Sequence, residues 1–459
     1  MVQHLPIMRT MSAKRASLHT LGCRLNQAET TILGEGLRKK GYEIVEFGQP
    51  TDLLVLNTCS VTADAERASR YVIRKTLKHS PQAFVAVTGC YAQTGAESLK
   101  RHAGVDLIVG NQYKLDLPAY VPAADSLAKR SIPDVFHTRT IGREDFELPH
   151  YGTPASTRAL LKIQDGCSAM CSFCIIPFAR GHERSRKVTD IMREAESLIA
   201  RGFREIVLTG VNIGQYQQSS YDFCGLLREL QLLGGLERLR ISSIEPTTVT
   251  DELLDMMASS TKICPYLHIP LQSGDDDVLS AMNRRHTVRA YTQMIERAAE
   301  AIPNIGLGTD LMVGFPGESE GAFRNTTNVA MDLPFSYLHI FSYSSRPGTA
   351  ASKMNSQVAG GTVKRRSALL HGIGDAKRLD FHKKQIGASE WVLFESGCQD
   401  GFRQGTASNF TKVAVAGDTD LHNQMKRVTM TAATERSAIG QLMTEREPTT
   451  YAYPIRLLS

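Results

Sequence analysis

Three cysteines, Cys167, Cys171 and Cys174, lie close together, spaced by three residues and then by two. Reduced thiolates this close on one loop can hold a compact cluster of iron and sulfide. A structural zinc site usually has a fourth protein ligand and paired cysteines, and His182 is the nearest spare candidate. A cubic four-iron cluster with three thiolate ligands leaves one iron open to a small molecule with amino and carboxylate groups. The spacing therefore indicates a catalytic iron–sulfur site, with three core cysteines meeting by chance as the alternative.

A second set of cysteines, Cys23, Cys59 and Cys90, is spread over the first hundred residues, and each ends a predicted strand. Loops at the carboxyl ends of neighbouring parallel strands converge on the binding crevice of an open α/β sheet. One such cysteine alone would be interpreted as a small buried hydrophobe. Three in equivalent places favour a common site. The other three match no motif and are expected to be packing or surface residues: Cys224, Cys264 and Cys398.

The elements that must position these loops alternate between strand-like and helix-like patterns in two stretches. The pattern of the first stretch predicts strands over 16–21, 42–47, 52–57, 83–88 and 105–109, with helices over 29–40, 63–78 and 95–101. The second predicts strands over 160–164, 205–209, 238–242, 266–270, 306–313 and 337–343. Its predicted helices include 188–201, 251–259, 288–301 and 320–332. The last part of the chain shows only short strand-like runs, at 391–395, 412–415 and 427–430.

These patterns predict an α/β protein: an N-terminal doubly wound parallel sheet, a central incomplete (β/α) barrel and a small C-terminal β-barrel. The corresponding domains are residues 14–124, 153–385 and 386–455, with a linker at 125–152.

Composition limits the class of protein. The 459 residues are 42% hydrophobic and 22% charged, which excludes extensive disorder. Nine cysteines without a secretion signal favour reduced thiols over disulfides. Without an apolar run of about 20 residues, we expect no membrane span and a cytoplasmic location. A net charge of +6 permits a polyanionic partner without establishing one.

The segment from Gln164 to Gly181, with Gly166 before the first cysteine of the loop and Pro177 after the last, resembles the methylthiotransferase branch of the radical S-adenosylmethionine (SAM) enzymes. The resemblance extends over about residues 16–450. It implies a radical SAM core over 153–385 with a four-iron (4Fe–4S) cluster that cleaves SAM to a 5′-deoxyadenosyl radical. It also implies a second 4Fe–4S cluster in the N-terminal domain, held by Cys23, Cys59 and Cys90, that handles sulfur. The six cysteines of the two sets are thus the expected metal ligands.

The resemblance suggests cofactor-facing residues on loops that follow the barrel strands. The candidates are Gly210, Asn212, Ser243, Glu245, Gln272 and Asp310. For each of them a helix cap or turn is an equally good explanation. Four basic residues after the cysteine loop, Arg180, Arg184, Arg186 and Lys187, are candidate phosphate ligands, with a solvated charged face as the alternative.

The C-terminal segment resembles the TRAM domain, a small RNA-binding barrel, around Gly405 to Val415. From Ile386 onward, however, seven Lys and Arg stand against eight Asp and Glu, a net charge of −1. RNA binding by this part must therefore depend on local clustering, such as Lys426 with Arg427, or on shape and stacking.

The reaction implied is addition of a methylthio group to carbon 2 of a modified adenosine next to the anticodon of a tRNA, with two SAM molecules consumed. The form of the segments at 21–27 and 243–246 most resembles the group acting on N6-threonylcarbamoyladenosine. Alternatives are isopentenyl-type adenosine and an aspartate of a ribosomal protein, and, from another class, a non-catalytic iron–sulfur protein that binds RNA or senses redox state. The partners expected are the tRNA anticodon loop, an external electron donor and a sulfur donor.

Overall fold

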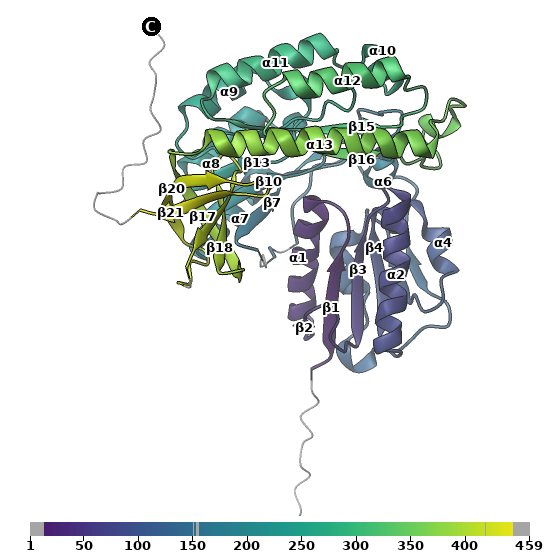
Figure 1. The fold of residues 1–459 in the computed structure, drawn as a ribbon. Coiled ribbons are helices and arrows are strands. Elements are labelled where there is room, and N and C mark those ends of the chain that lie inside the picture. Colours follow the sequence, from purple (N-terminus) through teal and green to yellow (C-terminus); the bar gives the residue numbers. More distant parts are fainter. Residues whose placement is uncertain (1–12, 150, 153–155, 418, 444–459) are drawn as a thin grey trace, which may run out of the picture. The chain divides into compact units, whose positions relative to one another are not determined.

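The computed structural model describes residues 13–149, 151–152, 156–417 and 419–443 (Figure 1). The predicted domain limits at 153 and 455 lie outside these residues. The chain forms two compact units. The N-terminal unit extends to Ile141 and also includes Phe178–Arg180, and the second unit contains the (β/α) and C-terminal barrels.

A six-stranded parallel sheet, in the order β2-β1-β3-β4-β5-β6, forms the centre of the N-terminal unit. Its strands are β1 (Arg15–Thr20), β2 (Glu43–Val45), β3 (Leu53–Thr58), β4 (Phe84–Gly89), β5 (Leu107–Val109) and β6 (Asp134–Phe136). The doubly wound parallel sheet is thereby confirmed. The sixth strand, β6, lies within the segment interpreted as a linker, where prolines and charges hid a three-residue strand.

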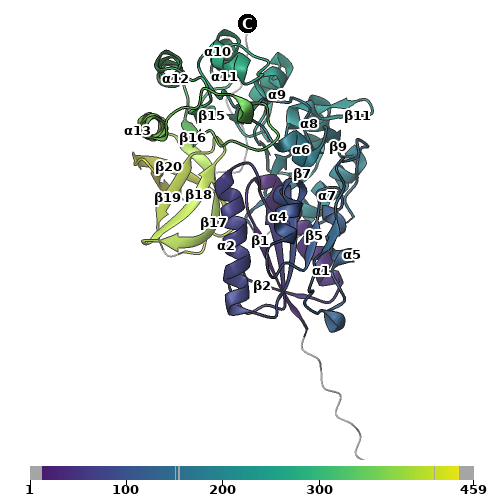
Figure 2. The same cartoon turned by 90° about the vertical axis from the view of Figure 1, so that its right-hand side faces the viewer.

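Helices cover both faces of this sheet (Figure 2). They are α1 (Arg24–Lys39), α2 (Ala63–His79), α3 (Cys90–Thr94), α4 (Ala96–Lys100) and α5 (Leu117–Tyr120), with 3-10 turns at Lys114–Asp116 and Ala124–Ser126. Alternate residues of β3 point to opposite faces, so Leu53 packs towards α1 and α5, while Leu54 packs towards α2 and α3. Helix α1 begins five residues earlier than predicted, because its first turns bury the polar residues Asn26 and Glu29 and so lack an apolar pattern.

The second unit contains six parallel strands in sequence order. They are β7 (Arg158–Lys162), β10 (Glu205–Thr209), β13 (Arg238–Ile241), β14 (Tyr266–His268), β15 (Gly306–Val313) and β16 (Tyr337–Ser342). They form two three-stranded sheets, β13-β10-β7 and β14-β15-β16. Single bridges, Leu239 to Ile263 and Ser243 to His268, join one sheet to the next. This arrangement confirms the incomplete (β/α) barrel.

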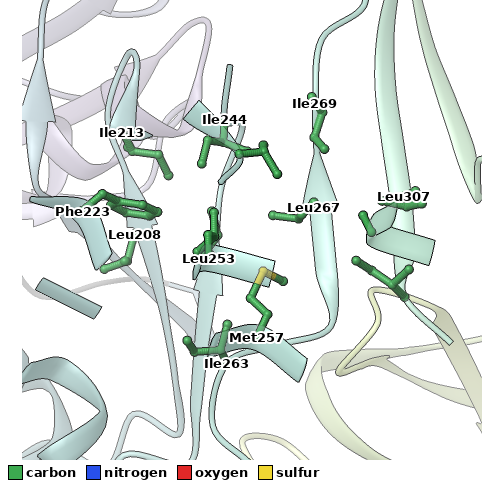
Figure 3. Packing of buried hydrophobic residues seen from close by; sticks show 14 of the residues in the cluster. Leu208, Ile213, Phe223, Ile244, Leu253, Met257, Ile263, Leu267, Ile269 and Leu307 are labelled. Carbon is green, nitrogen blue, oxygen red and sulfur yellow. The ribbon is translucent and has the colours of Figure 1, made fainter. Parts of the chain in front are cut away.

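The barrel helices are α6 (Ile176–Arg180), α7 (Val188–Ala200), α8 (Phe223–Leu232), α9 (Asp251–Ser259), α10 (Asp276–Ala281), α11 (Val288–Ala301), α12 (Glu320–Asp332) and α13 (Gly360–Lys384). Short elements occupy the connecting loops: β8 (Gln164–Asp165), β9 (Arg184–Ser185), β11 (Gln217–Gln218), β12 (Tyr221–Asp222) and 3-10 turns at Ile213–Gln215, Pro246–Thr248 and Ala351–Lys353. Figure 3 shows part of the core between strands and helices, with Leu208 beside Phe223 and with Leu253 and Leu267 among the other labelled side chains. Burial of these side chains fixes the strand ends that carry the loops.

The C-terminal strands close into a barrel in the order β17-β18-β19-β21-β20, which leaves no free sheet edge. They are β17 (Ser389–Gln399), β18 (Phe402–Ala407), β19 (Lys412–Ala416), β20 (Met425–Ala433) and β21 (Ala438–Leu442). The small β-barrel is confirmed, although the sequence pattern had indicated only three of its strands. No helix in the described ranges is long and apolar enough to cross a membrane.

Candidate metal centres

The N-terminal cysteines follow three adjacent parallel strands. Cys23 follows β1 and is the N-cap of α1, Cys59 follows β3, and Cys90 follows β4 as the first residue of α3. The sheet order 2-1-3 places the topological switch point between β1 and β3, where open α/β sheets bind ligands. The structure therefore brings the three cysteine loops to one end of the sheet, as the sequence predicted.

Two glycines allow these loops to approach one another. Gly22 has a φ of +98°, and a Cβ atom there would lie 3.0 Å from the Cys59 sulfur. Gly89 has a φ of +96°, and its Cβ would lie 2.4 Å from the carbonyl oxygen of Thr58. Any other residue at either position would push the cysteine loops apart, because both the backbone conformation and the space require glycine.

The thiols of this end of the sheet have few polar contacts. The backbone N–H of Val61 donates to Cys59 Sγ at 3.5 Å, and Asn111 Nδ2 donates to Cys90 Sγ at 3.9 Å. Burial raises the pKa of Cys59 to about 11, and the neighbouring Cys90 and Cys23 act in the same direction. Thiols in such surroundings become thiolates when metal binding displaces their protons.

This arrangement fits a polynuclear cluster better than a single ion. Among the residues described, no three His, Cys, Asp or Glu side chains converge to hold one metal ion. A four-iron cluster instead takes each thiolate on a different iron, so its ligands lie farther apart than those of one zinc ion. Three cysteines on separate loops, with glycines clearing the space between them, fit that requirement.

The loop carrying the other three cysteines lies between β8 and β9, which pair in antiparallel fashion. The backbone N–H of Cys167 donates to the carbonyl of Gly181 at 3.0 Å, and that of Cys174 donates to the carbonyl of Cys171, also at 3.0 Å. Gly166, with a φ of +75°, lies so close to the backbone of His182 that a Cβ would be 1.9 Å from its carbonyl oxygen. The two strands thus hold both ends of the cysteine loop.

Polar groups surround the sulfur atoms of this loop. The backbone N–H of Ala169 donates to Cys167 Sγ at 3.4 Å, and Arg284 Nη1 donates to Cys171 Sγ at 3.5 Å. Burial raises the pKa of Cys174 to about 12 and also raises that of Cys167.

A pocket opens beside Cys167 and Cys171, and Asn212 and Glu245 line it as expected for cofactor contacts. Asn212 Oδ1 and His286 Nε2 are buried there without a hydrogen-bond partner in the described part of the chain. Unsatisfied polar atoms of this kind indicate a polar ligand. The residues present therefore fit a cluster with a small polar molecule beside it.

The other predicted cofactor residues lie elsewhere. Gly210 packs against Gln164, whose Oε1 accepts hydrogen bonds from the N–H groups of Val211 and Asn212 at 2.9 Å, so it helps to position Asn212. Ser243 is exposed, and neither it nor Gln272 or Asp310 is part of the pocket lining. Gln272 is buried with a φ of +74°, and its Oε1 has no partner among the described residues.

Asp310 instead bridges two histidines. One of its oxygens accepts from His268 Nε2 at 3.0 Å and from His339 Nδ1 at 2.7 Å. Hydrogen bonding to Asp310 raises the pKa of His339. His268, Asp310 and His339 belong to the neighbouring strands β14, β15 and β16, and sequence reasoning missed His339 because it lies outside the strand-end loops.

Sequence reasoning also missed Arg284 and His286 as pocket residues. In the sequence, two adjacent arginines such as Arg284 and Arg285 are typical of a solvated charged face. Arg284 is instead nearly buried, and its Nη2 donates to Glu245 Oε2 at 2.5 Å. Burial, and secondly the charge of Arg284, lowers the pKa of His286 to about 4, so this imidazole is neutral at pH 7.

The interpretation of the four basic residues after Cys174 as phosphate ligands is wrong for two of them. Arg180 is 2% exposed and pairs with Glu29, and Arg186 is fully buried and pairs with Asp190 and Glu194. Burying a guanidinium requires a carboxylate partner, and that partner leaves it unavailable to a nucleic acid. The expectation for the remaining cysteines is confirmed, because Cys224 and Cys264 are buried and Cys398 is exposed.

Comparisons with known proteins agree with this geometry. Residues 161–330 match the radical SAM superfamily, and residues 15–110 match a family described as uncharacterized protein family UPF0004. The radical SAM methyltransferase TsrM from Kitasatospora setae, solved with cobalamin and an iron–sulfur cluster, superposes with a TM-score of 0.54 at 14% identity, covering 85% of this chain and 80% of that chain. This likeness concerns the fold alone. The matching residues and the cysteine loop define a radical SAM enzyme, a class that implies a 4Fe–4S cluster and SAM.

Three relatives show which group of radical SAM enzymes the chain is similar to. The threonylcarbamoyladenosine tRNA methylthiotransferase MtaB of Bacillus subtilis is 35% identical over 90% of this chain and 92% of its own length. The MtaB of Aquifex aeolicus is 37% identical over 81% of this chain and 91% of its own length. A tRNA-2-methylthio-N(6)-dimethylallyladenosine synthase of Cereibacter sphaeroides is 34% identical over 94% of this chain and 98% of its own length. The chain belongs to the radical SAM methylthiotransferase family.

Proposed function

We propose that the protein adds a methylthio group to carbon 2 of N6-threonylcarbamoyladenosine next to the anticodon of tRNA. The observation that carries this choice is the identity of 35% and 37% to two MtaB proteins, each over more than nine tenths of the relative's length. The non-catalytic alternative does not explain the polar pocket beside the cysteine loop.

The residues assigned to this reaction divide between the two sets of cysteines. Cys167, Cys171 and Cys174 hold the cluster that, when bound, supplies an electron for the cleavage of SAM. Carbon 2 of adenine carries a strong, nonpolar C–H bond that no acidic or basic side chain can usefully activate, so a radical is required. Cys23, Cys59 and Cys90 would hold a second 4Fe–4S cluster, which would supply the sulfur of the methylthio group, with the methyl group coming from one SAM molecule. A second SAM molecule supplies the radical.

The pocket beside the cysteine loop binds SAM in this proposal. Asn212 contributes an amide oxygen that has no hydrogen-bond partner among the described residues, and Glu245, fixed by Arg284, contributes a carboxylate. Neutral His286 offers Nε2 without the cost of burying a charge. Gln164 and Gly210 keep the Asn212 loop in place. Gln272 and Asp310 are proposed to act indirectly. The backbone N–H of Gln272 donates to the carbonyl of Asp310 and so helps to fix the strands that carry the pocket loops.

We expect Asn212→Ala to weaken SAM binding about tenfold, because one hydrogen bond contributes roughly 0.5–1.5 kcal/mol. Equilibrium binding of SAM to the anaerobically reconstituted enzyme measures the change. Ser243→Ala is the matched control, since Ser243 follows a barrel strand but is exposed and outside the pocket, and its affinity should be unchanged. Unaltered affinity in the Asn212 variant would remove it from the cofactor site.

The C-terminal barrel is proposed to contact the tRNA, with Lys426 and the exposed Arg427 on β20 as candidates. The anticodon loop is single-stranded, so it can place a base edge in a barrel mouth, whereas a paired stem cannot. The reaction further requires an external electron donor and a sulfur donor, and a cytoplasmic location where tRNA is available.

The substrate is tested with tRNA carrying deuterium at carbon 2 of the target adenosine. We expect methylthio product and deuterium in the released 5′-deoxyadenosine only when the threonylcarbamoyl group is present. The control tRNA is identical but bears an isopentenyl group. Equal turnover of that control would overturn the substrate choice while leaving the chemistry intact, a relevant outcome because the synthase from Cereibacter sphaeroides is nearly as similar.

A further inference from the structure

Three charged side chains are buried together in the N-terminal unit. Glu29 on α1, Lys114 and Arg180 have side-chain exposures of 1%, 2% and 2%. Lys114 Nζ donates to Glu29 Oε2 at 2.6 Å, and Arg180 donates to both Glu29 oxygens at 2.9 Å. Two cations therefore share one carboxylate. Burying such a set is costly, which calls for a function beyond packing.

Asn26 connects this charged group to two of the cysteine loops. Its Oδ1 accepts from Arg180 Nη2 at 2.6 Å and from Lys114 Nζ at 3.5 Å. Its Nδ2 donates to the carbonyl of Leu21 at 2.8 Å and to that of Thr58 at 3.0 Å. Leu21 and Thr58 are the residues just before the Gly22-Cys23 turn and before Cys59. One amide thus lies between the cations and the backbone that positions these cysteines.

Asn111 makes a second connection, to the third cysteine. Its Nδ2 lies 3.9 Å from Cys90 Sγ and donates to the carbonyl of Ala179 at 2.6 Å. Ala179 precedes Arg180, so the segment Phe178–Arg180, which belongs to the N-terminal unit, is fixed beside all three cysteine loops.

We propose that Arg180 and Lys114 are positioning residues whose charge raises the reduction potential of the cluster held by Cys23, Cys59 and Cys90. This inference rests on the proposed second cluster. A four-iron cluster with three thiolates is anionic, and uptake of one electron adds a further negative charge. A fixed cation in a low-dielectric interior stabilises the reduced form more than the oxidised form, which raises the potential. Arginine suits this purpose because it keeps its proton under all conditions at which the protein folds.

The measurement is an anaerobic redox titration followed by electron paramagnetic resonance. It uses the full chain carrying Cys167→Ala, Cys171→Ala and Cys174→Ala, so that only the N-terminal cluster contributes a signal. In that background we expect Arg180→Gln to lower the ratio of reduced to oxidised cluster about tenfold at a fixed ambient potential. For a one-electron couple this corresponds to a midpoint about 59 mV more negative.

Two controls distinguish the effect of losing a positive charge from the effect of disturbing the local structure. Arg180→Lys keeps the positive charge and should leave the midpoint near that of the parent. Arg38→Gln removes an exposed charge from α1, the helix that carries Glu29, and should have no effect. If Arg180→Gln does not fold, Lys114→Met carries the same expectation, because it leaves the pair of Arg180 and Glu29 intact.

An unchanged midpoint in the charge-removing variant, or equal shifts in the Gln and Lys variants, would overturn the inference and reduce these residues to a structural tie. A background protein that assembles no cluster would instead overturn the proposed second cluster. The two failures are therefore distinguishable.

Discussion

Replacing Cys167, Cys171 and Cys174 together by alanine is expected to abolish formation of 5′-deoxyadenosine. Bound iron should fall from about eight to about four per chain, since one of the two four-iron clusters loses its ligands. Iron and acid-labile sulfide are measured after anaerobic reconstitution, and cleavage of SAM is measured by chromatography with a chemical reductant.

The matched control for this variant replaces cysteines that neither site uses. Cys224 and Cys264 are buried in the barrel unit and Cys398 is exposed, so Cys398→Ala alone should keep both full iron and SAM cleavage. The triple variant should also stay folded, because its loop remains fixed by the pairing of β8 with β9. Full iron with continued cleavage in the triple variant would show that the radical cluster lies elsewhere.

Replacing Cys23, Cys59 and Cys90 together by alanine is expected to separate the two half-reactions. SAM cleavage should remain measurable, because the pocket beside Cys167 and Cys171 is unaltered. The methylthio product should be absent, because the sulfur-handling cluster has lost its ligands. Mass spectrometry of tRNA nucleosides from a deletion strain complemented with the variant measures the product.

Iron content supplies the control for this second variant, with about four irons expected to remain per chain. Alanine at these positions fits the space, since cysteine and alanine are both small and Cys59 and Cys90 are buried. Normal methylthio product from cells carrying only this variant would reduce the three cysteines to packing residues.

Much of the fold was predictable because its elements depend on short-range patterns. The strands β10 and β15 and the helices α9, α11 and α12 begin and end at the predicted residues. Strands buried on both faces and helices with one apolar face leave a clear periodicity in the sequence. The early start of α1 and the three-residue strand β6 were missed, because buried polar residues in one and proline-rich surroundings in the other obscure that periodicity.

Some residues of the candidate site could likewise be predicted from the sequence, and others could not. The cysteine loops could be located because each follows a strand, and the fold places strand ends together. Asn212 and Glu245 follow the same logic and line the pocket, whereas Ser243 follows a strand but faces solvent. Whether a loop residue turns inward depends on its neighbours in space.

The sequence by itself predicted the chemistry of this protein, because three cysteines at this short spacing are typical of ligands to an iron–sulfur cluster. Only the tertiary structure decided what the arginines do. Arg180 pairs with Glu29, Arg186 with Asp190 and Glu194, and Arg284 with Glu245. A buried charge must find its partner wherever the fold provides one, and the partner of Arg180 is 151 positions away in the chain. Local periodicity carries no trace of such a pair, so the same residue type is a solvated charge in one place and a buried, paired charge in another.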